Sequence, residues 1–304
     1  MRVVVTGGAG FIGAHSCQAL LEAGHAVTAL DDLSHGKREA LPPGADLVVM
    51  DVRSPQLAAE LERLRPEAVL HLAAQMDVRR SVADPMHDAS VNVLGTVNAL
   101  AAARRVGARR FDFASSGGAL YGEQETFPAP EQHPRRPASP YGVSKLCGEE
   151  YVELARRDGL SAMSLRYANV YGPGQDPMGE AGVVAIFLHK MLRGGDPVIN
   201  GDGEQTRDFV YVEDVARANL LALGAEATAA LNVGTGIETS VNDLARILAR
   251  AAGHRKRLAH GPVAPGEQRR SSVDPLAART ALGWEPRVAL EEGLGRTADW
   301  FRSR

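Results

Sequence analysis

Cysteine and aromatic residues are scarce in this sequence. Only two of its 304 residues are cysteine, Cys17 and Cys147, so no framework of disulfides can hold the fold together. Both stand in helix-like patterns, and we expect them to be small buried residues of a reduced compartment. Aromatic residues make up 5% of the chain and glycine reaches 32 residues, which suits an α/β protein with strands of Val, Leu and Ala.

An excess of charge and long apolar runs are lacking too. The net charge of −3 predicts no general attraction to nucleic acid or to an anionic membrane. The N-terminal MRVVVTGGAGFIG turns to glycine after three valines, so it carries no signal-peptide core, and no run approaches the roughly 18 apolar residues of a membrane span. We therefore expect a cytoplasmic protein. No two of the nine histidines are closer than six residues and no C-x-x-C occurs, so no metal site is predicted.

Short apolar runs alternate with helical patterns up to about residue 166. The expected strands are 2–5, 26–30, 46–50, 68–72, 110–114 and 162–166, and the expected helices between them include 11–23, 56–65, 88–106 and 141–157. Such alternation predicts an α/β fold with a doubly wound parallel (Rossmann) sheet and helices on both faces. From about residue 167 the alternation weakens into Gly- and Pro-rich loops at 169–182 and 194–208, followed by helices near 183–192, 212–223, 241–252, 275–282 and 290–301.

A glycine-rich turn, TGGAGFIG, joins the first expected strand to the first expected helix. Gly7 and Gly10 allow a tight turn and close approach of a pyrophosphate, while Gly13 lets the helix pack near the sheet. The helix N-terminus offers free N–H groups to the phosphates. The second strand ends at Asp31 and Asp32, at the spacing that lets a carboxylate accept hydrogen bonds from adenosine ribose. This pattern predicts dinucleotide binding.

Asp31 also bears on which dinucleotide is bound. A carboxylate there would repel a 2′-phosphate, so NAD is favoured over NADP, although Lys37 and Arg38 lie just beyond the strand end. We thus expect an NAD-binding Rossmann domain at 1–166 and a smaller substrate-binding domain at 167–304. The segment at about 208–234 is expected to return to the Rossmann domain, and the two lobes to share a cleft.

Tyr141 and Lys145 lie four residues apart at the start of an expected helix, in SPYGVSKLCGEEYVELA. This spacing puts both on one helical face. A phenol is a poor base at its reference pKa of about 10, and a neighbouring ammonium favours the phenolate. Alone the Y-x-x-x-K pair is common by chance, but together with the glycine turn it predicts an acid/base site.

At this point the chain resembles the extended short-chain dehydrogenase/reductase family, and within it the UDP-glucose 4-epimerase-like nucleotide-sugar epimerases. The resemblance spans nearly the whole length and rests on TGGAGFIG, DDLSHGKREAL, HLAAQMDVRRSV, NVLGT, SSGGALYG, YGVSK, RYANVYGPGQDP, GDGEQTRDFVYVEDVA and NVGTG. It implies an NAD-dependent isomerase, most simply a UDP-glucose/UDP-galactose 4-epimerase. Hexose, N-acetylhexosamine and uronic acid substrates all stay open.

The resemblance also implies site residues. It assigns cofactor binding to Gly7, Gly10, Phe11, Ile12, Gly13, Asp31, Asp32, Ser34, Asp51, Val52, Leu72, Ala73, Ala74, Asn92, Ser115, Tyr141, Lys145 and Tyr167. It assigns catalysis to Tyr141, Lys145 and Ser116, and substrate binding to Ser116, Tyr141, Asn169, Arg207, Glu267 and Arg269.

Two positions depart from the family pattern. The usual third catalytic Ser or Thr is Gly117 here, so Ser116 or Ser115 is expected to serve instead. The usual second diphosphate arginine is Ala264, and Arg269 or Arg270 is expected to supply its charge.

Two other functions compete with the epimerase. A nucleotide-sugar 4,6-dehydratase would carry an acidic pair where Gly117 and Gly118 stand, and a catalytically silent NAD-binding sensor would not need Tyr141 and Lys145. A UDP-sugar is the expected partner. The resemblance also implies a homodimer in which helices 88–106 and 141–157 pair across a two-fold axis.

Overall fold

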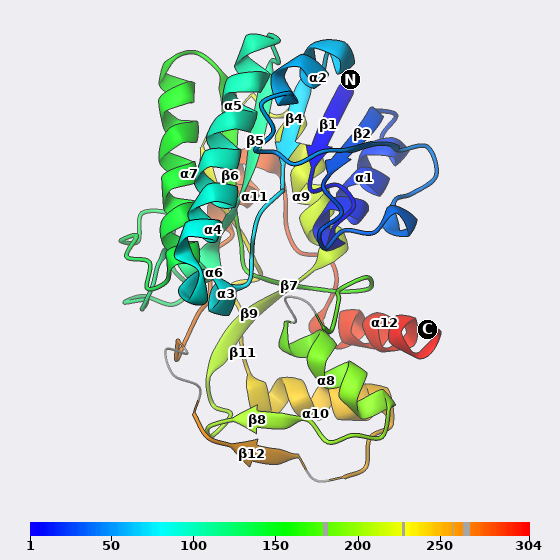
Figure 1. Cartoon of the computed structure of the whole chain (residues 1–304). Helices are drawn as coiled ribbons and strands as arrows, with labels where there is room; N and C mark the ends of the chain where they lie inside the picture. Colours follow the sequence, from blue (N-terminus) through cyan, green and yellow to red (C-terminus); the bar gives the residue numbers. More distant parts are fainter. Residues whose placement is uncertain (179–181, 227–228, 257, 264–267) are drawn as a thin grey trace.

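The structure is a computed structural model that describes residues 1–178, 182–226, 229–256, 258–263 and 268–304. Within these ranges, seven parallel strands form the main sheet in the order β10-β6-β5-β4-β1-β2-β3 (Figure 1). This confirms the predicted doubly wound sheet. The strands are β1 (Arg2–Thr6), β2 (Ala26–Asp31), β3 (Asp46–Val49), β4 (Ala68–His71), β5 (Arg110–Ser116), β6 (Ser161–Tyr167) and β10 (Ala230–Val233).

Alternate side chains of β1 face opposite helical layers, as the two-residue period of a strand requires. Val4 joins the core under α2, α5 and α7, whereas Val3 and Val5 join the core under α1 and α9. Figure 1 shows α5 and α7 side by side on one face of the sheet. The helices of this part are α1 (Phe11–Glu22), α2 (Leu57–Leu64), α3 (Val78–Ala83), α4 (Pro85–Ala89), α5 (Gly95–Arg105), α6 (Gly117–Leu120), α7 (Pro140–Arg157) and α9 (Val212–Gly224), with a 3₁₀ turn, η1, at Arg38–Ala40.

A second, smaller part lies below the main sheet in Figure 1. In the described residues it holds a three-stranded sheet, β11-β9-β7, and a two-stranded sheet, β12-β8. Its core includes Tyr171, Leu188, Phe209, Leu244 and Leu294. Its elements are β7 (Asn169–Tyr171), α8 (Val183–Leu192), β8 (Val198–Asn200), β9 (Thr206–Tyr211), β11 (Glu238–Ser240), α10 (Val241–Ala252), β12 (Ala259–Gly261) and α12 (Leu290–Arg302).

The chain crosses between the two parts more than once. After β9 it returns to the main sheet, where α9 packs against α1 and β10 pairs with β6. It then leaves again for β11, and α11 (Leu276–Leu282) packs back onto β10. Each part is therefore built from segments that are distant in sequence.

Three local predictions are wrong. The segments 169–182 and 194–208, expected as loops, contain β7, β8 and the start of β9. The single helix expected over 88–106 is divided, because residues Ser90–Leu94 form a π-helical turn, η2, between α4 and α5. Cys17 is buried as expected, but Cys147 is only half-buried on α7. No helix in the described ranges is both long and apolar enough to cross a bilayer.

Candidate functional site

The glycine turn between β1 and α1 fits closely between neighbouring strands. Gly7 has a φ of +68°, and a Cβ added there would lie 2.7 Å from the backbone nitrogen of Ala73, which follows β4. A Cβ on Gly13 would lie 2.0 Å from the carbonyl oxygen of Gly7. At Gly10 the nearest described atom would be 3.2 Å away, and no side chain caps the α1 N-terminus that begins there. Gly7 and Gly13 are thus needed for packing, while Gly10 leaves room for a phosphate to reach the helix N-terminus.

A cavity of about 300 Å³ opens above this turn; we call it the glycine-side cavity. It follows the carboxyl ends of the main strands, where β1 separates β4 from β2 and the strand order reverses, the usual place for a nucleotide in such sheets. The predicted cofactor residues that line it are Gly7, Gly10, Phe11, Ile12, Gly13, Asp31, Asp32, Ser34, Asp51, Val52, Leu72, Ala73, Ala74, Ser115, Tyr141, Lys145 and Tyr167.

Asp31 closes one end of this cavity. Its side chain is held by two backbone groups, since Ala9 N donates to Oδ2 (3.0 Å) and Leu33 N donates to Oδ1 (2.9 Å). Burial raises the pKa of Asp31, and these two hydrogen bonds oppose that rise. Next to it, Oδ1 of Asp32 accepts from both the N–H and the hydroxyl of Ser34. The carboxylate pair therefore stands in a fixed position at the end of β2.

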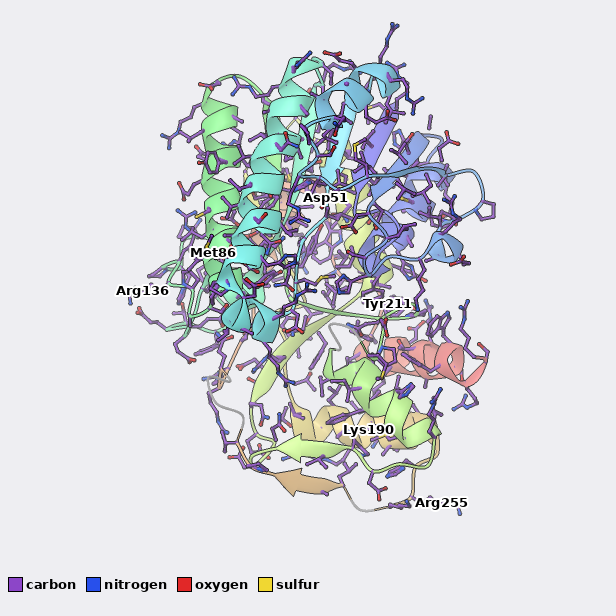
Figure 2. All side chains as sticks on the ribbon, viewed as in Figure 1. Asp51, Met86, Arg136, Lys190, Tyr211 and Arg255 are labelled. Carbon is purple, nitrogen blue, oxygen red and sulfur yellow. The ribbon has the colours of Figure 1, made fainter. Side chains whose placement is uncertain are left out.

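A guanidinium that the sequence did not single out lies at the same end. Arg53 lines the glycine-side cavity and pairs with Asp51, donating from Nε to Oδ1 at 3.0 Å (Asp51 is labelled in Figure 2). This bond holds the pKa of the Asp51 carboxyl below its usual range. In the sequence, Arg53 is marked only by its position directly after Asp51 and Val52, which were predicted at the cofactor.

Asn92 does not line the cavity, although the sequence placed it at the cofactor. It is buried in the π-helical turn, and its amide forms a reciprocal pair with the backbone of Gln75: Gln75 N donates to Oδ1 (2.8 Å) and Nδ2 donates to Gln75 O (2.7 Å). Gln75 and Met76 do line the cavity. Asn92 thus shapes the cavity wall from behind, and direct contact with a cofactor stays a prediction.

Tyr141 and Lys145 stand at the start of α7. Pro140 occupies the first turn and Ser139 caps it, accepting from Gly142 N at 3.2 Å. The ammonium Nζ of Lys145 donates to Ala114 O (2.8 Å) and lies 5.7 Å from the centre of the Tyr141 ring.

Lys145 is 4% exposed, and burial lowers its pKa to about 8, against the opposing negative charges of Asp88 and Glu149. An amine with such a pKa exchanges its proton near neutrality. The pair can therefore hold and pass a proton.

The serines at the end of β5 face the same region. Ser115 lines the glycine-side cavity, and within the described part of the chain its buried hydroxyl has no hydrogen-bond partner. Ser116 lines the neighbouring cavity described next. A Cβ on Gly117 would lie 2.8 Å from Cγ1 of Val273, so a side chain there would point toward Val273. The geometry agrees with a serine before Gly117 as the group that reaches a substrate.

A second cavity of about 490 Å³, the arginine-side cavity, adjoins the first. Of the predicted substrate residues it contains Ser116, Tyr141, Asn169 and Arg207, and Tyr141 lines both cavities. Arg207 on β9 donates from Nη1 to Thr206 O at 2.7 Å. Gln268 and Glu123 also line it without having been predicted.

Asp208 fixes the strand that carries Arg207. Its buried carboxylate accepts from the backbone N–H groups of Thr235, Gly236 and Val273 at 2.9–3.3 Å. Burial raises the pKa of Asp208, and these bonds oppose that rise. Three segments far apart in sequence are joined here, next to the arginine-side cavity.

The other arginines proposed for a diphosphate lie elsewhere. Arg269 does not line the cavity; its guanidinium forms two bonds with the Asp202 carboxylate, at 2.8 and 3.0 Å. Arg270 pairs with Glu238, and its guanidinium carbon Cζ lies 3.7 Å from the centre of the Phe127 ring. Their role at a substrate stays a prediction that requires these pairs to open. Glu267 and Ala264 lie outside the described residues.

Comparison with known proteins gives consistent results. The model of the NAD dependent epimerase/dehydratase family matches residues 3–234. A putative UDP-glucose 4-epimerase of Methanocaldococcus jannaschii is 46% identical over 99% of this chain and 98% of its own length. The solved structure of a Thermotoga maritima UDP-glucose 4-epimerase with UDP-glucose is similar at a TM-score of 0.97 and 46% identity, over 100% of this chain and 99% of the other. The solved structure of a Thermus thermophilus UDP-glucose 4-epimerase with NAD is similar at a TM-score of 0.94 and 44% identity, over 99% of both chains.

Proposed function

The chain belongs to the NAD dependent epimerase/dehydratase family, and from this premise we propose that it is a nucleotide-sugar 4-epimerase that interconverts UDP-glucose and UDP-galactose. The observation that carries the proposal is that Tyr141 lines both cavities, so its phenol faces the place of the cofactor and the place of the sugar. Tyr167 lines both cavities too, but its hydroxyl donates to Asn219 at 2.6 Å. Lys145, buried 5.7 Å from that ring, supplies the neighbouring charge.

NAD is the cofactor, and the glycine-side cavity suits it. Gly10 puts no side chain at the uncapped N-terminus of α1, where the pyrophosphate would bind, and Asp31 presents a fixed carboxylate where a ribose would lie. The same carboxylate would repel a 2′-phosphate. We propose that Lys145 and the unpartnered hydroxyl of Ser115 serve the nicotinamide end.

Acid/base chemistry falls to Tyr141. As a phenolate it removes the proton of the sugar 4-hydroxyl, and as a phenol it returns a proton to the same oxygen after the sugar has turned. Bound NAD would supply the hydride acceptor and donor for the carbon that bears this oxygen, with the hydride returned on the opposite face, so the reaction would have no net redox change. Lys145 as an ammonium favours the phenolate. We propose that Ser116, which lines the arginine-side cavity, donates to the substrate oxygen.

The arginine-side cavity has to hold the nucleotide while the sugar turns. We propose that Arg207 and Asn169, which lie on its wall, bind the diphosphate and sugar ends of the substrate. A UDP-sugar carries negative charge on both phosphates, and an arginine fork matches it with charge-assisted hydrogen bonds. Arg269 is the proposed second donor, on release from Asp202.

We also propose a homodimer through the α4–α5 and α7 face of the molecule. Apolar side chains are exposed there: Met86 (labelled in Figure 2) is 79% exposed, Leu94 62%, Leu154 53% and Tyr151 42%. Exposed apolar side chains that gather on one face of a protein mark a contact surface for another chain. A Met86→Glu/Leu154→Glu variant should sediment as a monomer where the parent sediments as a dimer; a monomeric parent would refute the proposal.

We propose the following division of the chain into domains, and a location in the cell. Residues 1–166 serve the cofactor and 167–304 the substrate, with about 208–234 belonging to the first lobe, as the pairing of β10 with β6 supports. We propose a cytoplasmic protein, in line with its two unpaired cysteines.

Product analysis tests the activity. The purified protein, incubated with UDP-glucose, UDP-N-acetylglucosamine and UDP-glucuronic acid in turn, should convert UDP-glucose to UDP-galactose without accumulating NADH. A 4-keto-6-deoxy product would instead identify a dehydratase. No conversion of any of the three, with NAD still bound, would indicate a silent sensor.

A further inference from the structure

One buried carboxylate beside the site has no part in the mechanism given so far. Asp88 on α4 is fully buried, and its two oxygens are occupied by three side chains. Oδ1 accepts from Gln75 Nε2 (2.9 Å) and from Asn92 Nδ2 (3.0 Å), while Oδ2 accepts from the Ser144 hydroxyl (2.6 Å). An amide nitrogen can only donate, so the arrangement suits the ionised carboxylate, which only accepts.

The three partners of Asp88 come from three separate segments of the chain around the glycine-side cavity. Gln75 lies in the loop after β4 and lines the cavity, Asn92 lies in the π-helical turn, and Ser144 lies on α7 directly before Lys145. Asp88 is therefore the point at which the catalytic helix is joined to the loop that forms the cavity wall.

On the basis of the proposed function, we propose that Asp88 is a positioning residue for the reaction: its carboxylate fixes α7, and with it Tyr141 and Lys145, against the wall of the glycine-side cavity. Without this tie, α7 would keep a second bond to this region, from Tyr141 N to the Ser81 hydroxyl on α3 (3.2 Å). That contact holds the helix end but not the turn that carries Lys145.

Asp88 also acts on Lys145 through its charge. Two carboxylates raise the pKa of this buried amine, Asp88 and Glu149. Glu149 is paired with Arg166, with Oε2 at 2.7 Å from Nη2, so much of its charge is compensated. The three hydrogen-bond partners of Asp88 are neutral, and its charge reaches Lys145 without such compensation.

The other titratable groups near Lys145 do not replace this charge. His71 on β4 is fully buried, and burial lowers its pKa to about 3, so it is neutral at physiological pH. Tyr141 lies on α7 itself, and Arg80 on α3 lines the same cavity with a positive charge. Loss of the negative charge of Asp88 should therefore lower the pKa of Lys145 and of the ionisable groups around it.

Asp88→Asn removes the charge and can keep the shape. The amide oxygen can still accept from Gln75 and Asn92, and the amide nitrogen can donate to the Ser144 hydroxyl, which turns to accept. With UDP-glucose we expect both limbs of the pH profile of kcat to move to lower pH by about one unit, because a buried negative charge is lost. At the optimum, kcat should fall about tenfold or more, with KM within twofold of the parent.

Asp214→Asn is the matched control. Asp214 is a buried carboxylate too, with Oδ2 accepting from the backbone of Arg287 and Val288 at 3.0 Å, but it lines neither cavity. This variant should lose thermal stability without moving either limb of the pH profile. Unshifted limbs in Asp88→Asn as well would overturn the electrostatic role of Asp88.

A second readout does not depend on the substrate. In the NAD-loaded protein, an NMR titration of the Lys145 amine, assigned with a Lys145→Met variant, should show its midpoint about one pH unit lower in Asp88→Asn. An unchanged midpoint for Lys145 would overturn the proposed role of Asp88, whether or not the parent converts a UDP-sugar. Failure of the parent to convert any UDP-sugar would refute only the proposed epimerase activity.

If Asp88→Asn fails to fold, Ser144→Ala still tests the tie. It cuts the bond from α7 to Asp88 but leaves the charge in place. We expect kcat to fall several-fold with both pH limbs unshifted. Unchanged kcat would show that this bond does not position α7.

Discussion

The two cavities are held in shape by different means. Around the glycine-side cavity several polar groups are already hydrogen-bonded within the protein: Asp31 accepts two backbone N–H groups and Asn92 pairs with the backbone of Gln75. Beside the arginine-side cavity, Arg269 is 58% exposed in the structure and bound to Asp202. The cofactor half is therefore preformed, whereas in the proposed substrate half Arg269 has to leave Asp202 before it can bind a diphosphate. Tyr141 lies where the two halves meet.

Tyr141→Phe should have the largest effect, because both halves act through its oxygen. Turnover should fall by about 10³-fold or more, the scale of a lost acid/base group, while bound NAD is retained. Steady-state rates and the NAD content of the purified variant measure this. Tyr151→Phe, on the same helix but lining neither cavity, is the control and should leave turnover unchanged. Near-normal turnover in Tyr141→Phe would mean that another group is the base.

Arg207→Ala tests the substrate half alone. The loss of one charge-assisted hydrogen bond, worth roughly 1.5–3 kcal/mol, should raise KM for UDP-glucose about tenfold to a hundredfold. NAD affinity should stay as in the parent, because Arg207 does not line the glycine-side cavity. A parallel loss of NAD binding would break the distinction between the two halves.

Asp31→Ala tests the cofactor half in the same way. NAD affinity should fall about tenfold and the discrimination against NADP should relax, since a ribose hydroxyl loses its acceptor and the repulsion of a 2′-phosphate disappears. Asp31→Asn separates charge from shape, because the amide oxygen can still accept one of the bonds from Ala9 and Leu33. Titration with both dinucleotides measures the preference. An unchanged preference would move the role to Asp32.

Arg269→Ala should have the smallest effect, a rise in KM of at most about tenfold, because the arginine must first leave Asp202 to reach a diphosphate. Asp202→Asn sharpens the test: freeing the guanidinium should lower KM. If neither variant changes KM or the affinity for UDP, the ion pair is the whole role of Arg269, and Arg270→Ala becomes the next variant to measure.

The same contrast explains what could be predicted from the sequence. The signals of the cofactor half are contiguous: the glycine turn occupies residues 7–13, and Tyr141 and Lys145 are one helical turn apart. The substrate half depends on contacts between distant segments, and the bond between Arg269 and Asp202, which are 67 residues apart, leaves no local pattern.

Irregular structure was missed for a related reason. The π-helical turn at Ser90–Leu94 keeps the apolar spacing of a helix and differs only in its hydrogen bonds. Asp88 was expected only as the first residue of that helix, although it joins side chains from three separate segments of the chain.

The central claim is that one carbon of the sugar is oxidised and reduced in turn at Tyr141, and UDP-glucose carrying deuterium at C4 tests it most directly. The account predicts UDP-galactose that retains the deuterium at C4, with no hydrogen taken from solvent at any carbon. Deuterium found at C6 would identify a dehydratase, and UDP-galactose that has lost the label to solvent would contradict the direct return of the hydride.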